Sequence, residues 1–274
     1  MDSGASGDSM LVDELRTALE LATDEELHHL TQLLFTRKFN PLDYWYTPQP
    51  SLIRSQKRDR QIQSIEARFR FLAADGVTIL RGQTAELTYR QVLFQVGEFL
   101  KIPCATDLAT TEIEAEIFLA LTSRAWDKLP QKEQRLLIDK VRRSLTQTHL
   151  PEPLPLQLQH NPLKLLLKGG STLVISGVLK SFLLKQIAQQ FAFHFATRQA
   201  MKTATTRMGS LILTQTAVRY GFTRSVLGAI VPALWGWFLV DLGWRAIATN
   251  YGRIIPMIVT LAQIRLTRDP LMVL

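Results

Sequence analysis

The side chains that most often carry enzyme chemistry are sparse in this sequence of 274 residues, and their spacing does not suit catalysis. His28 and His29 are adjacent on a predicted helix, so they point about 100° apart and cannot chelate one ion together. Cys104 is the only cysteine, and no basic residue lies near it on a helix to activate its thiol. A chain with one cysteine cannot form an internal disulfide, which suits a reducing compartment. We therefore expect no metal site and no nucleophile.

Two further patterns resemble catalytic motifs without meeting their requirements. Glu112, Glu114 and Glu116 alternate in the first turns of a predicted helix, where residues two apart diverge and acidic groups stabilise the helix dipole. The stretch 169–172, Gly-Gly-Ser-Thr, follows Lys168, but a phosphate loop needs the lysine after the glycines and a strand before them. The sequence therefore predicts a protein that is not an enzyme and that needs no cofactor.

Charge is distributed very unevenly along the chain. Residues 1–150 contain 19 Lys or Arg against 21 Asp or Glu, a net charge of −2, whereas residues 151–274 contain 13 against 3, a net charge of +10. Such a basic region attracts polyanions, which are nucleic acid or anionic lipid headgroups. Its basic residues interrupt apolar runs such as 163–167, 173–179 and 226–240, which favours a membrane with anionic lipid over nucleic acid.

Apolar residues at helical spacing recur along the first half of the chain. The predicted helices cover residues 11–22, 23–36, 52–74, 88–100, 111–129 and 130–146. Capping boxes are predicted at Thr23 with Glu26 and at Thr111 with Glu114. Because no segment alternates as a strand does, the predicted fold class is all-α, a helical bundle followed by a basic, apolar helical C-terminal part.

A proline-rich stretch coincides with the change of charge and marks a predicted domain boundary. Residues 1–9 are predicted to be a flexible tail, 10–149 a helical interaction domain, 150–160 a linker and 161–274 a membrane-associating helical domain. In this last part, helices are predicted over residues 162–168, 171–202, 206–220, 223–240 and 253–268.

The predicted helix 171–202 is amphipathic, with a basic polar face opposite a side rich in Phe and Leu. It is either an interfacial membrane helix or a core helix that is solvated on its lysine side. The residues predicted to contact the membrane, here and in the tryptophan-rich segment that follows, are Lys180, Lys185, Arg198, Lys202, Phe182, Phe191, Trp235, Trp237 and Trp244.

The tryptophan-rich segment could enter the bilayer. Its uncharged run, 225–240, has 16 residues, fewer than the ~20 that span a hydrocarbon core. If Asp241 forms an ion pair with Arg245, one turn later, the apolar stretch extends to residue 248. The alternatives are a buried core helix and a shallow or hairpin insertion.

A polar region between two predicted helices is a candidate for contact with a partner protein. Arg81, Tyr89 and Arg90 lie there, after a glycine that ends the preceding helix. The simpler interpretation is that both arginines pair with local carboxylates such as Glu86.

Short blocks in a fixed order carry a resemblance to a known family. They are residues 65–76, 80–82, 89–96, 112–114, 126–129, 251–259 and 261–265. Their order and spacing resemble the YaaW-like family of bacterial proteins over roughly residues 10–268. The central region of that family is similar to the ubiquinol–cytochrome c chaperone family, which implies a role in assembling a membrane complex.

These observations predict a scaffold or adaptor at the cytoplasmic face of a bacterial membrane, either peripheral or inserted as a single span or hairpin. One alternative, which the resemblance implies, is an assembly chaperone that binds subunits of a respiratory or photosynthetic membrane complex. Another is a soluble nucleic-acid-binding protein, whose binding would weaken steeply as the salt concentration rises.

Overall fold

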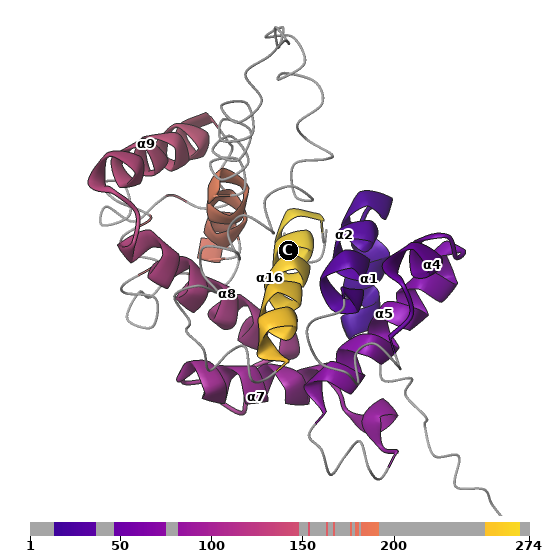
Figure 1. Cartoon of the computed structure of the whole chain (residues 1–274). Coiled ribbons are helices and arrows are strands. Elements are labelled where there is room, and N and C mark those ends of the chain that lie inside the picture. The colour runs from indigo at the N-terminus through magenta and orange to yellow at the C-terminus, as the bar shows by residue number, and fades with distance from the viewer. Residues whose placement is uncertain are drawn as a thin grey trace, which may run out of the picture.

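Figure 1 shows the computed structural model of the chain, in which every regular element of the described residues is a helix. The structure describes residues 14–36, 47–74, 82–147 and 250–268, and between 153 and 191 it describes residues 153, 163, 167, 176, 179, 180 and 182–191. The predicted all-α class is confirmed for this part of the chain.

The first two helices meet at a tight corner. Helix α1 covers Glu14–Leu21 and helix α2 covers Asp24–Phe35. The predicted capping box is confirmed, because the Glu26 amide donates to Thr23 Oγ1 at 3.3 Å and the Thr23 amide donates to Glu26 Oε2 at 2.7 Å. The box fixes the first turn of α2 only two residues after the end of α1.

The predicted helix 52–74 is two helices in the structure, α4 at Pro50–Arg54 and α5 at Arg58–Ala73. Lys57 precedes α5 with an extended ψ of 146°, which interrupts the helical hydrogen bonds. Proline at the first position of α4 needs no hydrogen-bond partner, so it starts this short helix without loss. Because apolar residues continue at helical spacing on both sides of this break, the sequence predicts one continuous helix.

The next elements follow the prediction closely. They are the helices α7 at Tyr89–Leu100, α8 at Thr110–Asp127 and α9 at Gln131–Gln147. The 3-10 turn η1 at Thr84–Glu86, which comes before them, is not predicted. The capping box predicted at Thr111 with Glu114 is wrong, because Ala109 precedes α8 and its amide donates to Glu112 Oε2 at 2.8 Å. The helix therefore begins one residue earlier than predicted, and Glu114 is free to point into the protein.

Helix α16, Tyr251–Arg268, lies at the centre of the described helices. Figure 1 shows it between α8 and the α1–α2 pair, and it packs against α1, α2, α5, α7 and α8. Residues 252–266 of this helix are all buried. Although α16 belongs to the predicted membrane-associating part, its apolar side chains share one hydrophobic core with the helices of the first half.

The helical segment 182–191 packs against the outer end of the bundle. The ring of Phe191 lies 6.3 Å from that of Trp126 in α8, and Ser144 in α9 donates a hydrogen bond to Gln186 Oε1 at 2.5 Å. Its leucine and isoleucine side chains belong to the same hydrophobic core as α16. The described part of the predicted helix 171–202 thus has its apolar side against protein.

Candidate functional site

Helix α16 carries three arginines into the N-terminal half of the chain, and the contacts of these arginines form the most unusual polar site in the described residues. At its first turn, Arg253 donates from Nη2 to the backbone oxygen of Thr36 at 2.8 Å. Thr36 follows the last residue of α2, where the carbonyl groups of a helix lack partners within it. The Arg253 guanidinium therefore gives a hydrogen-bond partner to the C-terminal end of α2, and its positive charge is stabilised by the negative end of the helix dipole.

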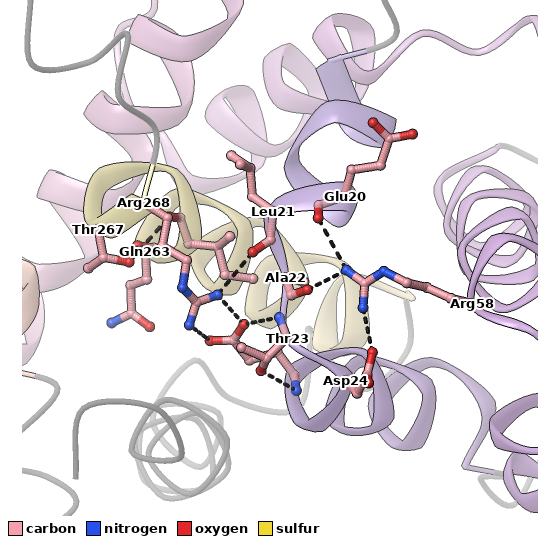
Figure 2. Close-up of polar contacts among 11 residues, drawn as sticks. Glu20, Leu21, Ala22, Thr23, Asp24, Arg58, Gln263, Thr267 and Arg268 are labelled. Atoms are coloured by element: carbon pink, nitrogen blue, oxygen red, sulfur yellow. Dashed lines mark hydrogen bonds and ion pairs between the residues drawn. The ribbon is translucent and has the colours of Figure 1, made fainter. Parts of the chain in front are cut away.

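At the opposite end of α16, Arg268 binds the corner between α1 and α2 (Figure 2). Its Nη2 lies 2.8 Å from Glu26 Oε1, its Nη1 contacts Glu26 Oε2, and Nη1 also donates to the Leu21 carbonyl at 3.1 Å. Two parallel bonds between a guanidinium and a carboxylate are among the strong, geometrically specific polar contacts in proteins. Glu26 therefore serves the capping box of α2 and the anchoring of α16 at once.

A second guanidinium reaches the same corner from α5 (Figure 2). Arg58 lies 2.5 Å from Asp24 Oδ1 and donates to the backbone oxygens of Glu20 and Ala22 at 3.1 and 2.5 Å. Two arginines from distant parts of the sequence thus satisfy consecutive carbonyl groups at the end of α1. The corner is held by side chains of α5 and α16 as well as by its own backbone.

Between these ends, Arg265 enters a buried polar cluster that we call the α16 junction. It consists of Glu14, Tyr89, Thr110, Glu114 and Arg265, from helices α1, α7, α8 and α16. Arg265 Nε lies 3.1 Å from Glu114 Oε2, and its Nη2 donates to the Glu14 carbonyl. Thr110 donates to the Glu14 carboxylate at 2.9 Å. Tyr89 and Glu114 are each 1% exposed and Arg265 is 3% exposed, so these three are shielded from solvent, while Glu14 at the edge of the junction is half-buried.

Burial dominates the electrostatics of the α16 junction. It raises the pKa of Glu114 to about 7, although the charge of Arg265 and the Tyr89 hydroxyl act in the opposite direction. Burial, with the nearby Glu114 charge, also holds the pKa of Tyr89 well above its usual value. A carboxyl group with this pKa exchanges its proton near neutral pH, which is the property of many functional sites and of some structural ion pairs.

This shift predicts that the stability of the protein depends on pH through Glu114. The folded state binds the Glu114 proton more tightly than the unfolded chain does. The stabilisation that this proton gives is therefore fully present below about pH 4.5 and is lost as pH rises to about 7. Unfolding by urea at several pH values should show the loss, at most about 3 kcal/mol, in the wild type relative to Glu114→Gln, which cannot titrate. Identical pH profiles for the two proteins would contradict the assignment.

The three alternating glutamates of α8 diverge, as predicted, and each has a different role. Glu112 caps the helix, Glu114 lies in the junction, and Glu116 Oε1 lies 2.7 Å from Lys180 Nζ. The expectation that all three serve the helix dipole is therefore too simple, because the last two bind cations from the second half of the chain.

The predicted partner-contact residues separate in the structure. Tyr89 is buried in the α16 junction and is not on a surface. Arg90 donates from Nη1 to the Leu108 carbonyl at 2.6 Å and from Nη2 to the Thr106 carbonyl at 2.8 Å, and it does not pair with Glu86 as the simpler interpretation expected. It binds the loop before α8 because that loop presents its carbonyl groups to α7. Arg81 lies outside the described residues.

Four of the predicted membrane-contacting residues lie in the described part. Phe191 is 3% exposed and packs on Trp126, Phe182 is partly buried against the core, and Lys180 pairs with Glu116. Lys185 is half-buried. The others lie outside the described residues, as does the predicted ion pair; they are Arg198, Lys202, Trp235, Trp237, Trp244, Asp241 and Arg245.

The arginines of α16 are the functional candidates that the sequence did not single out. Arg265 and Arg268 lie three residues apart near the end of a strongly apolar helix, and Arg253 lies near its start. Charged residues inside an otherwise apolar helix usually have partners when they are buried. The sequence could therefore have indicated that these arginines have buried partners. It could not have identified those partners, which lie more than 150 residues away.

Among the described residues, no group of His, Cys, Asp or Glu side chains could hold a metal ion, and no helix has both the length and the apolar character needed to cross a membrane. No protein-family model, curated protein or solved structure matches the chain. The resemblance to the YaaW-like family therefore stays a prediction from the sequence.

Proposed function

We propose that this protein is a non-enzymatic helical adaptor that attaches to the cytoplasmic face of a bacterial membrane through residues 192–249. In this proposal the bundle is the folded body of the adaptor, and the basic, apolar segment 192–249 binds anionic lipid as a peripheral or hairpin element.

The observation that carries the proposal is the division of positive charge within the second half of the chain. In the described parts of the second half, basic residues bind the bundle itself: Lys180 binds Glu116, Arg265 binds Glu114 and Arg268 binds Glu26. Residues 192–249 contain six further Lys or Arg and a single carboxylate, Asp241. Within its own sequence this segment has almost no acidic partners, and an anionic lipid surface would supply them.

The residues on either side of this segment are anchored in the bundle. Phe191 packs on Trp126, and the ring of Tyr251 stacks on that of Phe99 with 4.3 Å between centroids. A membrane-bound segment that leaves and re-enters the bundle at two fixed points would hold the bundle close to the lipid. This arrangement suits an adaptor better than a loosely tethered tail would.

The proposal is tested by flotation of the full-length protein with lipid vesicles. We expect binding to phosphatidylcholine vesicles that contain one-third phosphatidylglycerol, and weak binding to vesicles of phosphatidylcholine alone. The variant Arg198→Gln/Lys202→Gln/Arg207→Gln should bind the anionic vesicles at least tenfold more weakly, because each basic residue near such a surface contributes on the order of 1 kcal/mol.

A matched control removes the same charge from α4 and the start of α5. Arg54, Lys57 and Arg60 are exposed, and their replacement by glutamine should leave vesicle binding within about twofold of the wild type. Wild-type protein that stays unbound with anionic vesicles at low salt would overturn the proposal. Salt-sensitive binding to duplex DNA or RNA in its place would favour the nucleic-acid alternative.

A further inference from the structure

Helix α9 uses its charges differently from α16. Its apolar residues, Leu137, Val141 and Leu145, are buried in the core. The opposite face follows spacings of three and four residues and contains mainly exposed basic side chains. The members of this face are Lys132, Arg135, Leu136, Asp139, Arg142 and Arg143.

The outer face of α9 has a clear excess of positive charge. The helix contains five Lys or Arg, at 132, 135, 140, 142 and 143, and only two carboxylates, Glu133 and Asp139. Asp139 Oδ1 already lies 3.2 Å from Arg142, and its backbone oxygen accepts from Arg143. Lys140 is half-buried beside this face, and burial, with a smaller effect of the Arg143 charge, lowers its pKa.

We propose that the outer face of α9 is a second contact surface for the anionic bilayer, which orients the bundle on the membrane. This inference rests on the proposed function, because it takes the lipid surface as given and adds a part of the bundle that touches it. The contact is mainly electrostatic, with Leu136 as an exposed apolar side chain among the cations.

Leu136 favours a lipid surface over nucleic acid as the partner of this face. It is 46% exposed, one of three large apolar side chains exposed in the described residues, and it lies between Lys132 and Arg143 on the same face. A single exposed leucine is ordinary on a protein surface and suits a helix, but a nucleic-acid backbone offers this one no apolar surface. An interfacial headgroup region accepts both the cations and the leucine.

The position of α9 is consistent with this orientation. Ser144 in α9 is hydrogen bonded to Gln186 in the helical segment 182–191, which runs directly into residues 192–249. Figure 1 shows α9 at the outer edge of the described helices, with α8 between it and α7. The proposed lipid-binding segment therefore begins from a helix that α9 touches.

The test compares full-length variants by flotation with the same anionic vesicles. Replacing Lys132, Arg135 and Arg143 with glutamine should weaken binding by at least about tenfold, and Leu136→Ser should weaken it about threefold without any change in charge. Both variants should unfold at the temperature of the wild type, because the changed side chains are exposed.

The variant at Arg54, Lys57 and Arg60 is again the charge-matched control. If the α9 variants bind vesicles as the wild type does, the second surface is refuted while the proposed function stands. If the wild type itself fails to bind, the proposed function fails first, and this inference fails with it. If the α9 charge variant weakens binding but Leu136→Ser changes nothing, the face still contacts lipid through its charges, and the proposed role of Leu136 is wrong.

Discussion

A chain that ends at Thr249, and so lacks α16, is expected to lose its folded structure. Nine apolar side chains of α16 are fully buried: Ile254, Ile255, Met257, Ile258, Val259, Leu261, Ala262, Ile264 and Leu266. Each large aliphatic group contributes roughly 1.5–3 kcal/mol when it is buried, so the loss of the eight larger ones, about 12–24 kcal/mol, is comparable to or larger than the ~5–15 kcal/mol net stability of a typical domain. Circular dichroism and hydrogen exchange should show strong loss of helix and of amide protection.

The control for this truncation is a chain that ends at Asp269, which keeps the whole of α16 and should unfold at the wild-type temperature. By the same reasoning, residues 10–149 expressed alone should fail to fold cooperatively, because α1, α2, α5, α7 and α8 would all face water where α16 packs. A cooperative thermal transition in the chain that ends at Thr249 would mean that the core does not depend on α16.

The second large effect is expected at Arg265. Above pH 7, where Glu114 is ionised, replacing Arg265 with methionine leaves this carboxylate buried without its cation, and breaking a buried ion pair from one side typically costs about 3–5 kcal/mol. Replacing both partners, as Arg265→Met/Glu114→Leu, should recover most of the loss, because no charge then remains unpaired in the core. Urea unfolding of the wild type, both single variants and the double variant forms the thermodynamic cycle.

An exposed pair provides the comparison. Arg142→Met removes the contact with Asp139 on the surface of α9, and such pairs contribute at most about 1 kcal/mol. If Arg265→Met costs no more than Arg142→Met, the ion pair in the α16 junction has no structural importance. If the double variant is as unstable as the worse single variant, burial of the pair is not the cause.

Much of the local structure of this protein could be predicted from its sequence. Apolar residues at spacings of three and four define an amphipathic helix whatever it packs against, so α2, α7, α8, α9 and α16 were predicted to within about two residues. Thr23 with Glu26 is a contact within four residues, and for that reason it could be predicted as a capping box.

The break between α4 and α5 and the start of α8 could not be predicted in this way. Neither Lys57 nor Ala109 caps its helix with its own side chain, so the residue types at these positions do not mark the two helix starts. A helix boundary without a local signal is decided by the tertiary structure, because the backbone conformations on both sides of it differ little in local energy.

The candidate site depended on tertiary structure almost entirely. The sequence determined that the carboxylates lie mostly in the first half and the arginines of α16 in the second, with a large excess of positive charge between them. Only the fold decided that Glu26 and Glu114 would receive Arg268 and Arg265, across 242 and 151 positions of the chain. Charge attracts over any sequence separation, so composition alone does not distinguish a cation that binds lipid from one that stabilises the core; only the packing of α16 makes that distinction.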